Sequence, residues 1–239
     1  MWLQKVKKMK IKDEGIYLFS KKHGEKFLIL NILSKNYGLI RCLSRISKKN
    51  HILINLDLIS FELTYKDKDS FGFVKFNQKI SNKIDNAFFN LIKASASELC
   101  MKLLPTWEEN LVIYKSLYRL SKLFNQKNNL IIAEYIKWEF KFLEYLGYGL
   151  DVKKCSETGS SNVYYISPKS GNCVSYEVGR KFEKKLFIMP DCLKNNFTRF
   201  QTSEIESCLE ISSFFLQKIS DTPKKFVFRN QIISMANKL

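Results

Sequence analysis

The sequence predicts an α+β protein in which a small β-barrel is followed by an α-helical domain. Short β-rich runs separated by turn-prone segments fill the first 80 residues, and apolar residues at helical spacing begin near Ser81. With 239 residues and 45% apolar content, the chain is long enough for one large domain or two modest ones. We therefore expect a barrel domain over residues 1–80 and a helical domain over residues 81–239.

Five strands are expected in the first of these domains. Turn-prone pieces such as Lys-Lys-His-Gly and Lys-Asp-Lys-Asp-Ser separate them. Five strands in about 80 residues suit a small closed barrel, for which the OB-fold is the leading candidate, and such barrels commonly bind single-stranded nucleic acid. The expected strands are Ile16–Phe19, Phe27–Leu33, Leu39–Leu43, Leu58–Tyr65 and Phe71–Phe76.

The remaining residues predict helices around one irregular lobe. Gly147 is expected to end a central helix, because glycine accepts the left-handed conformation of a C-terminal cap. Polar turns between about residues 150 and 190 indicate loops and short strands. The expected helices cover residues 84–104, a segment from an N-cap at Thr106 to about Phe124, a segment from Asn128 or Asn129 through Trp138 to Leu146, Thr202–Ile219 and Phe226–Ala236.

The charge of the chain favours a polyanionic partner. There are 40 Lys and Arg against 23 Asp and Glu, a formal net charge of +17. An AT-rich genome also produces lysine-rich proteins, so the position of the charge matters more, and the excess is concentrated in the barrel domain. Tyr17, Phe19, Phe27 and Tyr37 interleave with the cations and could stack bases, but alternation along a strand sends half of its positions inward, so each is favoured as barrel core and the cations are the first candidates. The candidate DNA-binding residues are Lys21, Lys22, Lys26, Lys35, Arg41, Arg45, Lys48 and Lys49.

The sequence argues against an enzyme and against a membrane protein. It has no glycine-rich phosphate loop and no Gly-x-Ser-x-Gly or His-Glu-x-x-His motif, and its only histidines are His23 and His51. No apolar run approaches the roughly 18 residues of a membrane span, and the first residues lack the apolar core of a signal peptide. Six cysteines without paired spacing suit reduced thiols. We expect a cytoplasmic protein without a cofactor.

One motif is specific enough to indicate a family. The stretch Trp138-Glu-Phe…Leu146-Gly-Tyr-Gly-Leu-Asp151…Cys155, followed by Tyr165-Ile-Ser-Pro-Lys-Ser-Gly171, resembles the RecO family of DNA repair proteins. The resemblance implies a bacterial, nucleoid-associated recombination mediator that binds single-stranded and possibly double-stranded DNA and anneals complementary strands. It further implies that the protein helps to load RecA onto DNA covered by single-stranded-DNA-binding protein, with RecR as a partner.

The resemblance also bears on individual residues. In RecO proteins the helical domain receives the acidic, apolar C-terminal tail of single-stranded-DNA-binding protein, and Lys137 is the candidate contact for that tail. A solvated lysine on the face of a helix is the alternative interpretation of Lys137. Some members hold the lobe together with a four-cysteine zinc site. Here Cys155 and Cys173 stand near the first position of each zinc knuckle, but Thr158 and Tyr176 stand three residues further on, so no metal is expected. Glu139, among aromatic residues, is interpreted as a paired structural carboxylate.

Two alternatives remain open. Cations that contact a phosphate backbone do not distinguish DNA from RNA, so an RNA-binding OB-fold protein fits the same residues. An interaction protein of this fold that has lost DNA binding also fits, if the charge reflects composition alone.

Overall fold

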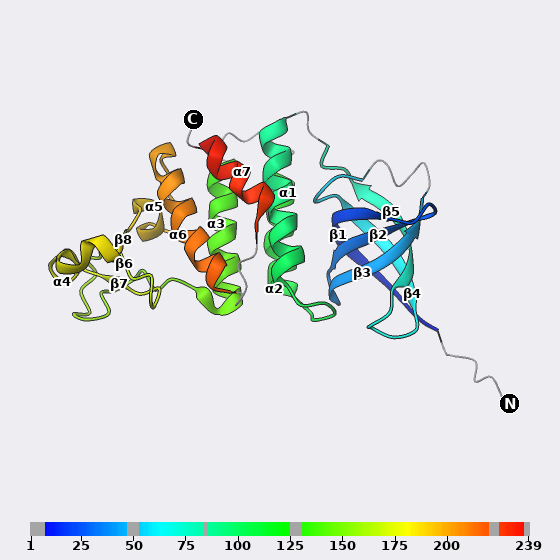
Figure 1. Cartoon of the computed structure of the whole chain (residues 1–239), viewed down its shortest axis with the longest axis horizontal. Coiled ribbons are helices and arrows are strands. Elements are labelled where there is room, and N and C mark those ends of the chain that lie inside the picture. The colour runs from blue at the N-terminus through cyan, green and yellow to red at the C-terminus, as the bar shows by residue number, and fades with distance from the viewer. Residues whose placement is uncertain (1–7, 47–52, 84–85, 125–130, 220–224, 237–239) are drawn as a thin grey trace. The chain divides into compact units, whose positions relative to one another are not determined.

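A computed structural model describes residues 8–46, 53–83, 86–124, 131–219 and 225–236 (Figure 1). The chain divides into two compact units, residues 1–128 and residues 129–239. The last barrel strand ends at Ile80, and the domain boundary expected at that point stays a prediction. Within the described ranges, no helix combines the length and the apolar character needed to cross a membrane.

A closed five-stranded barrel begins the first unit and confirms the predicted α+β fold with an N-terminal OB-like barrel. The strand order is β1-β2-β3-β5-β4, and every neighbouring pair is antiparallel except β3 and β5, which run parallel. All five predicted strands are present, although the first is much longer than expected. The strands are β1 (Met9–His23), β2 (Phe27–Ser34), β3 (Gly38–Arg45), β4 (Leu58–Tyr65) and β5 (Gly72–Ile80).

Alternation along the strands fills the barrel interior with apolar side chains. Leu30, Ile32, Ile40 and Leu63 belong to this core and are almost fully buried. Tyr17 belongs to it as well and is 6% exposed. The favoured interpretation of Tyr17 as barrel core is therefore confirmed, and its alternative role in base stacking is wrong, because the strand directs it inward.

Two helices complete the first unit, α1 (Ala87–Leu103) and α2 (Leu111–Leu123). Asn86 caps α1 by accepting a hydrogen bond of 3.0 Å from the backbone N–H of Phe89. The predicted N-cap at Thr106 is wrong, because Thr106 forms a β-bridge with Leu39 and the helix starts at Leu111.

Gly38, at the start of β3, allows the loop between α1 and α2 to approach the barrel closely. Its φ is +69°, and a Cβ at this position would lie 1.6 Å from the carbonyl oxygen of Glu108. Only glycine satisfies both conditions. The neighbouring Trp107 N–H donates to the Leu39 carbonyl at 2.9 Å, which holds the loop at the start of β3.

The second unit contains helices and an irregular lobe. Helices α3 and α6 pack against each other (Figure 1). At the end of α3 a π-helical turn, Glu144–Tyr148, contains Gly147 with a φ of +85°, so the predicted left-handed termination at Gly147 is confirmed. The helices are α3 (Ile131–Leu143), α4 (Tyr176–Gly179), α5 (Asp191–Lys194), α6 (Ile205–Lys218) and α7 (Val227–Ala236), with short 3-10 segments η4 (Arg180–Lys185) and η5 (Thr202–Glu204).

A buried ion pair joins three of these helices. Glu139 of α3 is 0% exposed and Arg229 of α7 is 1% exposed. The Arg229 guanidinium donates to both Glu139 carboxylate oxygens, at 2.6 and 2.9 Å, and Ser212 of α6 donates to the same carboxylate at 2.6 Å. The interpretation of Glu139 as a paired structural carboxylate is confirmed.

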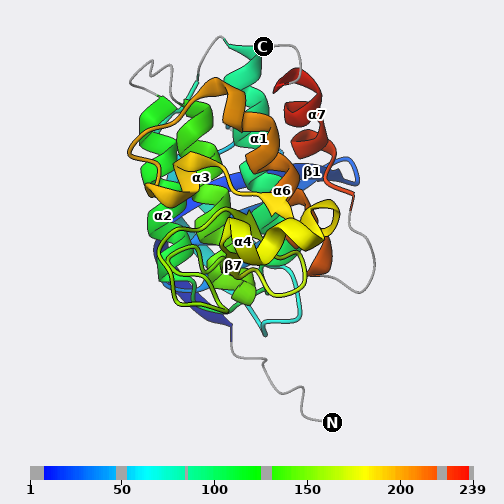
Figure 2. The ribbon, with the colours of Figure 1, turned by 90° about the vertical axis from the view of Figure 1, so that its left-hand side faces the viewer.

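The lobe is built from turns and a small sheet, as predicted for residues 150–190. Figure 2 shows it facing the viewer. Backbone hydrogen bonds tie its two halves together, from Ser156 N–H to the Cys173 carbonyl at 2.9 Å and from Cys173 N–H to the Asp151 carbonyl at 3.0 Å. The three short strands, in the order β7-β6-β8, are β6 (Tyr165–Ile166), β7 (Cys173–Val174) and β8 (Phe187–Ile188).

Candidate nucleic-acid interface

Three rows of side chains cross the outer face of β1, β2, β3 and β5, and each row contains a cation and an aromatic ring. Strand register decides membership, because residues that pair directly across antiparallel strands point to the same side of the sheet. A β-bulge between Tyr17 and Phe19 brings Phe19, Lys21 and His23 to the outer side. The rows are Phe19, Asn31 and Arg41; Lys21, Ile29, Leu43 and Phe73; and His23, Phe27 and Arg45. We call these residues the cation–aromatic face.

Two of the three phenylalanine rings on this face are open to solvent, and Phe27 is half-buried. Phe19 is 42% exposed and Phe73 is 52% exposed. Phe27 of β2 meets Phe73 of β5 edge-on, with ring centroids 5.8 Å apart, so the two rings bridge over β3. Exposed rings held by strands and flanked by cations form the type of surface on which unpaired bases stack.

Ion pairing divides the barrel into two electrostatically different sides. Lys10 and Lys12 of β1 both lie 3.5 Å from Glu62 of β4, and the Lys10 charge is the main reason that the pKa of Glu62 is lowered. Lys79 of β5 pairs with Glu14. Within the described residues, Lys21, on the other side, forms no such pair with a carboxylate. Its positive charge is thus uncompensated.

The structure brings some of the predicted DNA-binding cations together and separates others. Lys21 and Arg45 share the cation–aromatic face with Arg41, and Lys22 and Lys26 lie at the hairpin end of the same strands, exposed. Lys35 lies in the turn after β2, about 26 Å along the strand direction from Phe27. Lys48 and Lys49, like His51, lie outside the described residues.

Arg41 occupies the border of the face. Its guanidinium donates to the carbonyl oxygen of Met101, in the last turn of α1, at 3.5 Å. A cation at a helix C-terminus also interacts favourably with the helix dipole. Arg41 therefore has a structural contact in addition to its place on the face.

Sequence reasoning did not select Phe73. Its strand was predicted, but its position beside Leu43 depends on the parallel pairing of β3 and β5, which closes the barrel across the chain. The one signal in the sequence is the run Phe71-Gly-Phe73, in which two aromatics separated by a glycine occupy the same side of a strand.

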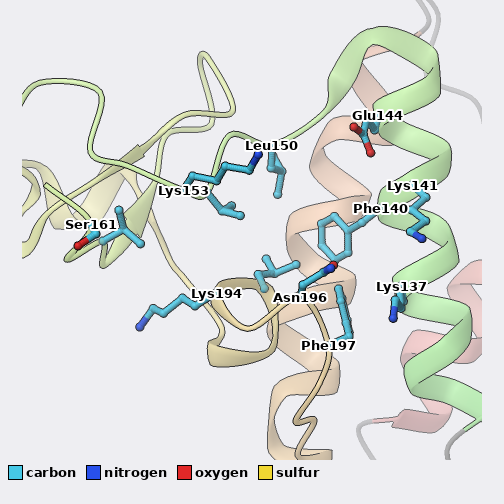
Figure 3. Close-up of a pocket in the computed structure, with 13 residues that line it drawn as sticks. Lys137, Phe140, Lys141, Glu144, Leu150, Lys153, Ser161, Lys194, Asn196 and Phe197 are labelled. Atoms are coloured by element: carbon cyan, nitrogen blue, oxygen red, sulfur yellow. The ribbon is translucent and has the colours of Figure 1, made fainter. Parts of the chain in front are cut away.

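A pocket of about 570 Å³ lies in the second unit between α3 and the lobe (Figure 3). The side chain of Lys137, the predicted contact for a partner's tail, is one of the residues that line it. Phe140 and Phe197 face each other there, with ring centroids 6.1 Å apart. We call it the α3 pocket; its lining residues are Lys137, Phe140, Lys141, Glu144, Leu150, Val152, Lys153, Ser161, Val163, Leu193, Lys194, Asn196 and Phe197.

The α3 pocket combines positive charge with apolar walls. It has four lysines and a single acid, Glu144, and six of its residues are apolar. The charge of Lys194 is partly compensated, because its ammonium group lies 2.8 Å from the Asp191 carboxylate. Such a lining complements a ligand that carries carboxylates beside large apolar side chains.

Cys155 and Cys173 sit in the lobe as buried thiols. Burial raises the pKa of Cys155, but hydrogen bonds from the Thr158 hydroxyl and from nearby backbone N–H groups outweigh burial and lower the pKa to about 7. Cys173 donates to the Lys154 carbonyl at 3.0 Å. In the part of the chain that the structure describes, no three His, Cys, Asp or Glu side chains gather as a metal site.

Comparison with known proteins identifies the family. The family model described as "Recombination protein O C terminal" matches residues 90–224. The chain is 31% identical over 221 residues to DNA repair protein RecO of Wolbachia pipientis wMel, a match that covers 88% of this chain and 92% of that protein. The chain belongs to the RecO family. DNA repair protein RecO of Ehrlichia chaffeensis is 27% identical over 245 residues, covering 95% of this chain and 98% of that protein.

The RecO match extends over both units. DNA repair protein RecO of Rickettsia canadensis is 29% identical over 220 residues, with 88% of this chain and 89% of that protein covered. The family model includes α3 and the lobe, whose motif first suggested RecO. It starts at residue 90, after the barrel strands.

Proposed function

We propose that this chain acts in DNA repair and recombination as a mediator that binds single-stranded DNA on the cation–aromatic face. It anneals complementary strands and helps to load RecA onto DNA covered by single-stranded-DNA-binding protein. The observation that carries this proposal is the three-row arrangement, in which each row pairs a cation with a ring. Family membership supports the setting, and RecR is the expected partner in loading.

The chemistry of the face favours single strands. Lys21 and Arg45 are placed to contact phosphates, while Phe19, Phe27 and Phe73 present rings to bases. Such contacts are largely independent of base sequence and weaken as salt rises, because bound cations release condensed counterions. In this mechanism the chain binds and presents strands, and no bond is made or broken.

A salt titration with a fluorescent oligo-dT tests the face. Neutralising two cations, with Lys21→Gln and Arg45→Gln, is expected to weaken binding and to reduce the dependence of log affinity on log salt by about 0.7 for each lost phosphate contact. The matched control, Lys10→Gln with Lys12→Gln, changes net charge by the same amount on the side where these lysines pair with Glu62. Equal affinity and equal salt dependence for both double variants would exclude the face as the binding site.

We further propose that the α3 pocket receives the acidic, apolar C-terminal tail of single-stranded-DNA-binding protein. The lysines supply attraction for carboxylates, and Phe140 and Phe197 supply an apolar wall for the terminal side chains. Lys137 is half-buried on α3, so its contact with a bound tail is shielded from solvent and from salt.

Lys137→Glu is expected to weaken binding of an acidic tail peptide by tenfold or more, about 1.4 kcal/mol, and to leave oligonucleotide affinity nearly unchanged. The control is Lys169→Glu, which carries the same charge change at an exposed residue outside the pocket. Isothermal titration calorimetry with the peptide, and with a peptide whose acids are replaced by amides, measures both effects. If the Lys137 variant binds the acidic peptide as tightly as the parent does, the pocket is not the site.

RNA is the alternative ligand for the face. Cations and rings that meet backbone and base faces do not read the 2′-hydroxyl, so the same titration is run with oligo-U. Binding that is at least tenfold tighter for RNA than for DNA would favour an RNA-binding protein over a recombination mediator.

A further inference from the structure

The lobe carries a second exposed surface in which rings and cations lie together. It comprises α4 and η4, where Tyr176 is 48% exposed and Phe182 is 58% exposed. The cations Arg180, Lys181, Lys184 and Lys185 lie in η4, against two acids, Glu177 of α4 and Glu183 of η4. We call this surface the lobe patch; its residues are Tyr176, Arg180, Lys181, Phe182, Lys184 and Lys185.

The Tyr176 ring is held in place by the lobe core. It meets Tyr164 edge-on at 5.3 Å and stacks on Tyr165 at 6.2 Å between ring centroids. Gly179 brings α4 so close to Tyr165 that a Cβ there would lie 2.4 Å from that ring. Arg180 follows Tyr176 by four residues, one helical turn, which places the cation beside the ring. A fixed ring with one side open is a preorganised stacking surface.

Phe182 has no such support. Within the described residues it makes no ring contact, and 58% of its surface is open to water, so the ring is free to stack on a partner. The basic residues on both sides of it, Lys181 and Lys184, form no ion pair with any described carboxylate. The surface therefore combines exposed aromatic rings with a net positive charge.

The charge decides what kind of partner fits. An apolar partner segment would leave the cations desolvated without counter-charge, whereas a nucleic acid neutralises them with phosphates. The rings favour an unpaired strand, because a duplex hides the base faces on which aromatic side chains stack. The α3 pocket has apolar walls that can enclose the side chains of a peptide, whereas the lobe patch presents Tyr176 and Phe182 openly, which favours single-stranded nucleic acid.

We propose that the lobe patch is a second binding site for single-stranded nucleic acid, separate from the cation–aromatic face of the barrel. This inference rests on the proposed function, and it specifies how one chain engages two strands. The barrel face holds one strand and the lobe patch holds the other. Annealing then needs no nucleotide cofactor, because each strand arrives with its charge neutralised and its bases presented.

Titration of the full chain with an oligo-dT of about ten nucleotides, a length within the usual size of one such site, measures the number of sites. The parent is expected to bind two oligonucleotides at low salt. In the Lys181→Glu/Lys184→Glu variant, the affinity of the second binding step is expected to fall at least tenfold. This variant should also anneal complementary oligonucleotides at least fivefold more slowly. The matched control is Lys154→Glu/Lys169→Glu, at exposed lobe residues outside the patch, which keeps both steps.

A pair of substitutions at Phe182 separates stacking from charge. Phe182→Ala is expected to weaken the second step about tenfold, whereas Phe182→Tyr retains the ring and keeps affinity within about twofold. All substituted side chains are exposed, and thermal melting verifies that each variant stays folded. Equal affinity for the alanine and tyrosine variants would overturn the assignment of Phe182 as a stacking residue and, with it, the patch.

Failure of this inference differs from failure of the proposed function. If the lobe variants bind and anneal like the parent while Lys21→Gln/Arg45→Gln binds weakly, the lobe patch is wrong and the barrel site stands. If the lobe variants lose the second step while the barrel variant is unchanged, the patch stands and the barrel site is wrong. A parent chain that binds no single-stranded DNA overturns both.

Discussion

At the scale of single residues, the Glu139–Arg229 pair places two opposite charges in the core of the second unit. Both side chains are buried, and the carboxylate accepts from Arg229, Ser212 and Tyr135. Replacing a buried ion pair by apolar residues is often neutral, whereas removing one partner leaves an uncompensated buried charge. The pair therefore locks α3, α6 and α7 together only while both members are present.

Glu139→Gln is expected to destabilise the chain by about 3–5 kcal/mol, because Arg229 would keep its charge without a counter-ion. Urea unfolding measures this loss. Glu210→Gln, at an exposed position of α6, serves as the control and is expected to change stability by less than about 0.5 kcal/mol. Comparable stabilities for the two variants would show that the pair contributes little.

The sequence predicts the role of Glu139 but not its partner. An acid among Trp138, Phe140 and Phe142 is expected to be buried and paired, because a lone buried carboxylate is costly. Arg229 lies 90 residues further along the chain, and no local pattern connects the two.

At the scale of secondary-structure elements, Lys93 fixes α1 within the first unit. It is 1% exposed, and its ammonium group donates to the Asn82 carbonyl at 2.6 Å. Burial lowers the pKa of Lys93 to about 8, and the nearby Asp57 carboxylate offsets part of that effect. Burial likewise raises the pKa of Asp57. The hydrogen bond to Asn82 thus ties the segment after the barrel to α1, and Asp57 compensates part of the buried Lys93 charge.

We expect this charge to make stability depend on pH. An unfolded lysine has a pKa of about 10.4, so between pH 8 and pH 10 the unfolded chain binds more protons than the folded chain, and stability rises with pH. The gain from Lys93 is up to about 3 kcal/mol. Urea unfolding at pH 7.5 and pH 10 measures it as the difference from Lys93→Met, which lacks the titrating group. Lys115→Met, at an exposed position of α2, should behave like the parent. A Lys93→Met variant with the parent's pH response contradicts the expectation.

Elements with a regular apolar pattern were predicted well. Leu58–Tyr65 coincides with β4, because alternation and flanking turns define a strand locally. The predicted start of α2 is wrong, because Thr106 followed by Trp-Glu-Glu has the composition of a helix start but does not begin a helix. The β-bridge to Leu39 overrides that local preference. Likewise, only Lys137 of the α3 pocket is predicted from the sequence. Phe140, Lys141 and Glu144 follow it closely along the chain, but most of the lining comes from segments distant in the sequence, residues 150–163 and 193–197.

At the scale of the whole molecule, the chain has 40 Lys and Arg against 23 Asp and Glu, and the ion pairs between them are unevenly distributed over the surface. The barrel compensates its cations on the β1–β4 side, and in the second unit the lobe keeps the cations of η4 unpaired within the described residues. Composition alone predicts a preference for polyanions, but it does not say which surfaces carry it. That distribution follows from strand register and from which acids face which lysines.

The ion pairs of Glu62 with Lys10 and Lys12 have a kinetic consequence. These ion pairs cancel positive charge on one side of the barrel. The positive potential around the barrel is therefore strongest on the other side, where Lys21 and Arg45 lie. If this face binds DNA as proposed, a diffusing strand is steered toward one orientation before contact, which raises the rate of productive encounters and makes that rate fall with ionic strength. In the proposed mechanism, Glu62 thus influences the rate at which a strand finds a face that it does not touch.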